Sequence, residues 1–201
     1  MYHKRNIDSH LLEWSKQKEH KPLLLRGARQ VGKSTAVRHF AENFESYVEI
    51  NFERNPEYKA LFLGNLDVKR ITSQMSAMYG KAIVAGKTLL FLDEIQECKE
   101  AIMALRFFRE DMPQLHVVAA GSLLEFALDE LATFGVGRIH SLYIHPMTFD
   151  EFLIANGNQL LLDERNQSSA QSPLPEPIYN KIVELFRTYM IVGGMPEAVP
   201  S

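Results

Sequence analysis

The stretch LLLRGARQVGKST, residues 23–35, places a GxxxxGK[ST] motif directly after a run of apolar residues. In this pattern the glycines let the backbone curl, so that successive N–H groups point at phosphate oxygens. Lys33 reaches the β and γ phosphates, and the Ser34 hydroxyl ligates Mg²⁺. The predicted nucleotide-binding residues are therefore Gly27, Ala28, Arg29, Gln30, Val31, Gly32, Lys33, Ser34 and Thr35.

The residues on either side of the motif favour the same interpretation. Residues 23–26 suit a strand buried on both faces, and residues 34–44 carry Val37, Phe40 and Phe44 at helical spacing. Strand, loop and helix in this order are the context that the motif requires, with the positive end of the helix dipole directed at the phosphates. The alternative is a glycine-rich turn without a ligand, and this context argues against it.

Composition excludes several functional classes. The chain has 201 residues with 22 Lys and Arg against 25 Asp and Glu, so its net charge of −3 gives no global basic field of the kind that binds nucleic acid. The single cysteine, Cys98, excludes an internal disulfide framework, and the seven histidines show no metal-site spacing. No apolar run approaches the about 18 residues that span a bilayer. We expect a cytoplasmic protein without membrane contact.

Apolar runs alternate with helical patterns along the chain, which is typical of a parallel sheet with helices on both faces. The expected strands lie at residues 23–26, 47–52, 88–92, 117–120 and 139–144. Helices are expected at residues 34–44, within 56–79, and at 101–111, 149–153 and 178–192. The predicted fold class is α/β, a three-layer P-loop NTPase fold with a five-stranded parallel sheet.

The C-terminal quarter of the chain differs from this pattern. Residues 166–177 read NQSSAQSPLPEP, a composition typical of a flexible connector. We therefore expect an ATPase core at 1–157, a loop or linker at 158–177, and the start of a helical lid or C-terminal domain at 178–201. Gly193 and Gly194 end one helix and Pro196 starts another close to the last residue, so we expect the chain to be truncated inside a following domain.

Two adjacent carboxylates follow the apolar run at 89–92. Asp93 is placed to hold Mg²⁺, and Glu94 is placed to polarise the attacking water as a general base. On their own, these two residues could simply begin the turn after a strand. Together with the phosphate loop they predict ATP hydrolysis with ATP and Mg²⁺ as ligands.

Two further polar residues end predicted strands, where the carboxyl ends of parallel strands converge on a ligand. Ser122 ends the fourth strand, and its hydroxyl either contacts the γ phosphate or caps a helix that starts at Leu123. Asn51 ends the second strand, where its amide is positioned to hydrogen-bond Glu94 or serves as an ordinary strand-end residue.

Arginine can stabilise the charge that develops on the γ phosphate during transfer. Arg138 lies between Gly137 and the fifth strand and is a candidate arginine finger, acting in cis or from a neighbouring subunit, or else a surface arginine in a turn. At the N-terminus, residues 2–12 precede the first strand and could cover the adenine, with Arg5 or Ile7 in contact.

Taken together, these motifs resemble a known family, the prokaryotic AAA+ superfamily ATPases that carry an uncharacterised C-terminal domain. The resemblance lies in residues 27–35 together with LLFLDEIQE (89–97), AAGSLL (119–124), Gly137-Arg138, HPMTFDEF (145–152) and GGMPEAV (193–199). It implies the additional-strand sheet order, with the serine-bearing strand between the phosphate-loop strand and the acidic strand. It also implies roles for Ser122 as a sensor, Glu94 as the catalytic base and Arg138 as the finger.

Three functions remain open from the sequence. The first is an ATPase domain that drives or gates a C-terminal effector domain, which in related ATPases is nuclease-like or DNA-binding. The second is a nucleotide switch that hydrolyses slowly and controls a partner or DNA. The third is a small-molecule kinase, which the paired Asp93 and Glu94 disfavour because a kinase excludes water from the γ phosphate. Partners would be a nucleotide triphosphate, a second copy of the chain, and a protein or nucleic acid.

Overall fold

The core of the protein is a five-stranded sheet whose neighbouring strands are all parallel. A computed structural model describes residues 2–122, 124 and 137–199. The strand order is β2-β3-β4-β1-β5, so β4 lies between β1 and β3. The strands are β1 (Leu23–Arg26), β2 (Ser46–Asn51), β3 (Thr88–Asp93), β4 (His116–Ala120) and β5 (His140–Tyr143). The predicted order, with the serine-bearing strand in the centre, is confirmed.

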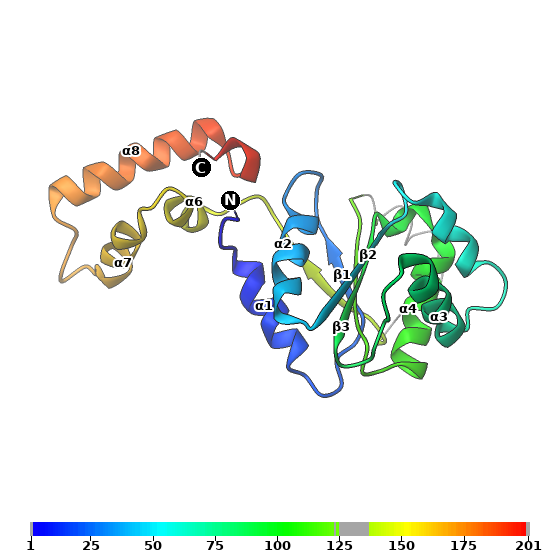
Figure 1. Ribbon diagram of the computed structural model, residues 1–201. Helices are drawn as coiled ribbons and strands as arrows, with labels where there is room; N and C mark the ends of the chain where they lie inside the picture. The colour runs from blue at the N-terminus through cyan, green and yellow to red at the C-terminus, as the bar shows by residue number, and fades with distance from the viewer. Residues whose placement is uncertain (1, 123, 125–136, 200–201) are drawn as a thin grey trace.

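Helices cover both faces of this sheet. On one face lie α1 (Asn6–Ser15) and α2 (Lys33–Phe40), followed by a 3-10 turn, η1 (Ala41–Asn43). On the other face lie α3 (Val68–Tyr79) and α4 (Lys99–Asp111), with the 3-10 turns η2 (Pro56–Phe62) and η3 (Ile95–Glu97). Figure 1 shows α1 and α2 on one side of the strands and α3 and α4 on the other. The three-layer α/β fold is thus confirmed.

The apolar strands are divided between two hydrophobic cores. In β3, Leu90 and Leu92 pack into the core under α3 and α4, whereas Leu89 and Phe91 pack into the core under α1 and α2. Successive side chains of a strand point to opposite faces, so a continuous apolar run is what a sheet covered on both faces requires. All four side chains are fully buried.

Three helices and a 3-10 turn form a C-terminal lobe beside the sheet (Figure 1). They are α6 (Phe149–Ala155), α7 (Gln159–Gln167), α8 (Glu176–Val192) and η4 (Pro196–Ala198). The expected loop or linker at 158–177 is wrong for its first half, because α7 occupies it. This helix is stabilised by the burial of Leu162. It is also stabilised by two hydrogen bonds from Arg165 to the carboxylate of Asp150 in α6, at 2.7 and 2.9 Å.

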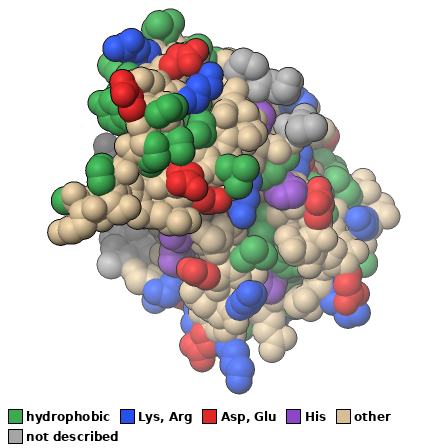
Figure 2. Space-filling model, turned by 90° about the vertical axis from the view of Figure 1, so that its left-hand side faces the viewer, with side chains coloured by type: hydrophobic (Ala, Val, Ile, Leu, Met, Phe, Trp, Pro, Cys, Tyr) green, Lys and Arg blue, Asp and Glu red, His purple; other side chains and the backbone are tan. Residues whose placement is uncertain are grey.

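Much of the apolar surface of the C-terminal lobe faces solvent. Of the α8 residues only Ile182 is buried, whereas Met190 and Ile191 are 69% and 87% exposed. Figure 2 shows hydrophobic side chains between acidic and basic ones on this side of the molecule. None of the helices described is both long and apolar enough to cross a membrane.

Candidate functional site

The phosphate-loop motif forms a curled connection between β1 and α2. Gly27 has a φ of 148°, and a Cβ atom there would clash with the carbonyl oxygen of Ile144. Gly32 has a φ of 91° and forms the N-cap of α2. Gln30 also has a positive φ, 63°, which is uncommon for a residue with a side chain. Backbone strain of this kind is typical of functional loops and needs surrounding structure to hold it.

Lys33 lies at the start of α2 with its side chain folded over the loop. Its ammonium donates hydrogen bonds to the carbonyl oxygens of Gly27 and Ala28, at 2.9 and 2.7 Å. The residue is only 7% exposed, and this burial lowers the pKa of Lys33, although Glu94 and Asp93 oppose the shift. A poorly hydrated cation at this position would gain strongly from contact with a phosphate anion.

Ser34 and Asp93 form the predicted metal-binding pair. The Ser34 hydroxyl donates to both carboxylate oxygens of Asp93, at 3.1 and 3.0 Å. Burial raises the pKa of Asp93, while the hydrogen bonds from Ser34 and Asn51 oppose this. Both groups supply the hard oxygen ligands that Mg²⁺ prefers. No group of three or more His, Cys, Asp or Glu in the described part of the chain could hold a metal, so the remaining ligands would come from phosphates and water.

The prediction that Asn51 holds Glu94 is wrong. The Asn51 amide donates to Asp93 at 3.1 Å, and its carbonyl oxygen accepts from the backbone N–H groups of Glu53 and Arg54. In the sheet register Asn51 lies opposite Asp93, which brings it within reach of that carboxylate. Asn51 therefore fixes the orientation of the metal-binding carboxylate.

Glu94 leaves the end of β3 with a φ of 49°, in the left-handed region. Its carboxylate accepts a hydrogen bond of 2.7 Å from the side-chain amide of Gln96. Gln96 also fills the space above Gly121, where a Cβ atom would clash with its side-chain oxygen. Gln96 thus joins the candidate base to the end of β4.

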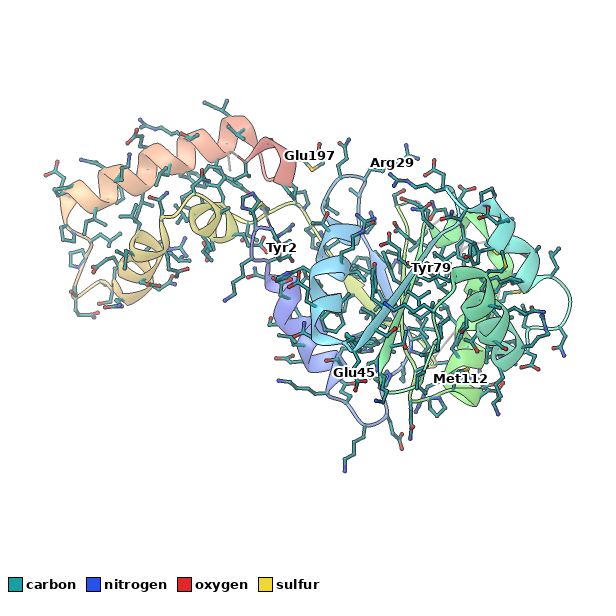
Figure 3. All side chains as sticks on the ribbon, viewed as in Figure 1. Tyr2, Arg29, Glu45, Tyr79, Met112 and Glu197 are labelled. Carbon is teal, nitrogen blue, oxygen red and sulfur yellow. The ribbon has the colours of Figure 1, made fainter. Side chains whose placement is uncertain are left out.

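Lys33, Ser34, Glu94 and Gln96 line one cavity of about 430 Å³. Its wall consists of Arg29, Gln30, Gly32, Lys33, Ser34, Thr35, Glu53, Glu94, Gln96, Glu97, Ser122, Pro196 and Glu197. Figure 3 shows Arg29 and Glu197 at the same end of the molecule, far from Glu45 and Met112. The cavity therefore lies at the carboxyl end of the sheet.

Ser122 lies on this wall, as the strand order requires. Leu123, where its alternative role as a helix cap would start, lies outside the described residues. The same holds for residues 135 and 136 before Gly137. Ser122 therefore lines the same cavity as Lys33 and Glu94.

Arg138 does not approach this cavity. It precedes β5, and because β5 runs parallel to β1, it lies at the amino end of the sheet. There its guanidinium contacts Glu110 at 2.8 Å. The expectation of a finger acting in cis is not supported, because a full strand length separates Arg138 from the phosphate loop. Any contact with a nucleotide would have to involve a neighbouring copy.

Five residues of the cavity wall were not among the predicted site residues, namely Glu53, Gln96, Glu97, Pro196 and Glu197. Pro196 and Glu197 return to the cavity from the far end of the chain. The Pro196 ring lies 3.6 Å from the position that a Cβ atom on Gly32 would take. Proline after a Gly-Gly pair signalled a sharp turn, but nothing local indicated where that turn would dock.

The two N-terminal residues expected to contact the adenine are both buried in the protein. Arg5 and Ile7 are 7% and 5% exposed, and neither lines the cavity. Ile7 packs in the core under α1, and Arg5 binds protein groups behind the phosphate loop. Their side chains are thus occupied within the fold.

Comparison with known proteins agrees with this fold. A family described as "AAA domain" matches residues 19–153, which include the phosphate loop, Asp93, Glu94 and Ser122. The chain belongs to this AAA domain family. No curated protein sequence matches it well enough to count as a relative.

Solved structures of low sequence identity share the fold of this AAA domain protein. A Walker-type ATPase of Pyrococcus abyssi matches with a TM-score of 0.54 and 18% identity, covering 97% of this chain and 65% of its own. A chain of the Drosophila ORC bound to DNA gives 0.53 and 16%, covering 91% and 55%. PCH-2 of C. elegans gives 0.51 and 13%, covering 96% and 59%. The chain thus spans less than two thirds of these proteins.

Proposed function

We propose that this domain binds ATP with Mg²⁺ and hydrolyses it. The observation that carries the proposal is that Lys33 and Ser34 at the start of α2 line one cavity with Glu94 after β3, while Ser34 binds Asp93 at the end of β3. The phosphate loop would bind the triphosphate through its backbone N–H groups and Lys33. Glu94 would accept the proton of the attacking water. Ser122 would contact the γ phosphate or this water.

The charges on the wall of the cavity support a requirement for Mg²⁺. Two cationic side chains face four carboxylates, and these are Arg29 and Lys33 against Glu53, Glu94, Glu97 and Glu197. A bare triphosphate would be repelled by this surplus of negative charge. Mg²⁺ held by Ser34 and Asp93 would supply the charge that neutralises the phosphate oxygens.

Replacement of Glu94 by Gln tests the hydrolytic role. We expect phosphate release by E94Q to fall by about 10² to 10⁴-fold, the usual contribution of a general base, while the affinity for ATP stays within a few-fold of the wild type. A coupled phosphate assay and titration calorimetry measure the two quantities. Unchanged turnover of E94Q would show that Glu94 is not the base.

A nucleotide switch with slow hydrolysis is the second candidate, and the Gln96 contact favours it. The amide of Gln96 occupies one oxygen of the Glu94 carboxylate, so the base has to exchange this partner before it can take a proton. If Gln96 restrains the base, Q96A should hydrolyse ATP faster than the wild type. Slower hydrolysis would instead indicate that Gln96 orients the base for catalysis. A kinase is the least favoured reading, because Glu94 would activate water.

We further propose that the C-terminal lobe acts as a helical lid and that nucleotide turnover drives or gates a following effector domain. Pro196 and Glu197 on the cavity wall support this, since they would sense the bound nucleotide. Arg138 would act as a finger in trans, which requires a homo-oligomer. The match to a chain of the DNA-bound Drosophila ORC leaves nucleic acid among the partners to be tested, beside a protein partner.

A further inference from the structure

The side chain of Arg5 makes a buried contact behind the phosphate loop that neither the motif nor the proposed mechanism uses. Its Nη1 donates to the carbonyl oxygen of Val31 at 3.0 Å, and its Nη2 donates to that of His145 at 2.7 Å. Its Nε donates to Glu151 at 3.0 Å, and the side chains of this ion pair are 6% and 5% exposed. One guanidinium therefore joins the phosphate loop, the connection after β5 and helix α6.

The bond to Val31 bears directly on anion binding. Because a trans peptide is planar, the carbonyl of Val31 and the N–H of Gly32 point in opposite directions. Gly32 lines the cavity, whereas Arg5 does not. By holding the carbonyl outward, Arg5 directs the Gly32 N–H group toward the site of the phosphates. Arg5 thus fixes one of the donors of the cradle without touching the ligand.

Glu151 fixes the other side of this contact. One carboxylate oxygen accepts both the Arg5 Nε–H and the backbone N–H of Asn6, the latter at 2.7 Å. The other oxygen accepts the N–H of Thr148 at 2.8 Å, and the Thr148 hydroxyl accepts the N–H of Glu151 in return. This capping box starts α6, so the carboxylate that binds Arg5 also sets the first turn of the C-terminal lobe.

The chain of contacts continues back to the phosphate loop. Next to the capping box, the N–H of Met147 donates to Gly194 at 2.6 Å, and the hydroxyl of Tyr189 donates to the Met147 carbonyl at 2.8 Å. Gly194 is needed there, since a Cβ atom would clash with the Met147 backbone. Two residues further on, Pro196 packs beside Gly32. Both ends of the C-terminal lobe are thus anchored to the same loop.

We propose that Arg5 and Glu151 are positioning residues that couple nucleotide binding at the phosphate loop to the C-terminal lobe. The proposal rests on the proposed binding of ATP. A nucleotide that orders the 31–32 peptide would strengthen the Arg5 contact and thereby stabilise the amides held by Glu151. In return, loosening the contacts of Glu151 at the start of α6 would lower the affinity of the loop for nucleotide, because coupling between two sites is reciprocal.

The wild-type protein tests this without any variant. Hydrogen exchange of peptides that contain Asn6 and Thr148 is followed with and without saturating ADP and Mg²⁺. Both amides bind Glu151, and neither residue lines the cavity beside the phosphate loop. Slower exchange of both amides on ADP binding is expected. If ADP binds and both amides exchange at unchanged rates, the coupling is refuted while nucleotide binding stands.

The variant R5K tests whether Arg5 acts through the geometry of its hydrogen bonds or only through its charge. Lysine keeps the ion pair with Glu151 but cannot donate to three partners in the fixed planar geometry of arginine. We expect R5K to bind ADP about tenfold more weakly, as the loss of a charge-assisted hydrogen bond predicts, and to lose the ADP-dependent protection at Thr148 when saturated. The control is R165K, which alters a similar arginine–carboxylate pair at neighbouring Asp150 without reaching the loop.

R165K should retain wild-type affinity and protection. Equal behaviour of R5K and R165K would overturn the proposal, as would full protection at Thr148 in R5K. E151Q provides a second variant that keeps the shape of the side chain and removes its charge, and it should resemble R5K. Failure of the wild type to bind ADP would instead refute the proposed function, so the two failures can be distinguished.

Discussion

The charged side chains discussed at the two ends of the sheet differ in burial. At the carboxyl end, Lys33 and Asp93 are buried, and burial shifts the pKa of each toward its neutral form. In the described part of the chain, the two residues other than glycine with positive φ, Gln30 and Glu94, are also found at this end. At the amino end, by contrast, Arg138 pairs with Glu110 on the surface. Buried charges and strained backbone, which both lower stability, are concentrated where the site lies. This is expected when selection for function opposes stability.

The largest effect should come from matched glycine substitutions at the two ends. Gly27 combines a φ of 148° with a clash at the Ile144 carbonyl, so G27A should lower the free energy of unfolding by more than about 3 kcal/mol. Gly137, near the amino end, has a φ of 76° and no described atom within 4 Å of an added Cβ. G137A should cost about 1 kcal/mol from backbone strain alone. Urea denaturation compares the two, and equal losses would contradict the comparison.

Replacement of Asp93 and replacement of Glu49 should shift the midpoint of thermal unfolding in opposite directions. Asp93 is held ionised against burial, so D93N should raise the midpoint of thermal unfolding by about 2–4 °C, as about 1 kcal/mol does in a domain of this size, while weakening Mg²⁺-dependent nucleotide binding. Burial opposes ionisation of Glu49 too, but hydrogen bonds from Arg38 and Tyr47 outweigh it and lower its pKa.

Glu49 therefore stabilises the fold at neutral pH, and this contribution disappears as the pH falls through its lowered pKa. Accordingly, E49Q should lower the unfolding midpoint. Calorimetric scans of the two variants in ligand-free buffer provide the measurement. A lower midpoint for D93N would mean that its hydrogen bonds outweigh the cost of burying the charge.

The smallest effect that we expect is a pH dependence of stability caused by His116 at the amino end of the sheet. His116 stacks on His20 with 4.0 Å between ring centroids, and burial, with a smaller contribution from His20, lowers the pKa of His116. The unfolded chain then binds a proton near pH 6.5 that the folded state resists, so stability falls as the pH drops below about 6.5. H116Q should lose less stability than the wild type between pH 7 and 5. Parallel pH profiles would show that His116 does not contribute.

The sequence predicts the sheet and most of the site because their signals are local. The apolar runs that become β1 and β3 each end in a functional motif, and a parallel sheet brings such ends together. The position of Arg138 at the amino end follows from the same topology, since it precedes a strand rather than following one. Its candidacy for a cis role could have been excluded from the sequence.

Contacts between distant segments could not be predicted in this way. Arg5 and Glu151 are 146 residues apart, and each is unremarkable in its own segment. The choice of Asn51 between Asp93 and Glu94 depends on the register of β2 against β3, which alternation of side chains does not determine. Helix α7 was missed because its stabilising pair, Arg165 and Asp150, joins two helices.

Calorimetric titration of ATP in the presence of Mg²⁺ tests the central claim most directly, with one cation removed at each end of the sheet. K33A should weaken binding by about 10 to 100-fold, the cost of losing charge-assisted hydrogen bonds to phosphate. R109A removes an arginine that contacts Glu19 at the amino end and should bind ATP like the wild type. Wild-type affinity in K33A, or equal losses in both variants, would contradict the assignment of the nucleotide site to the carboxyl end of the sheet.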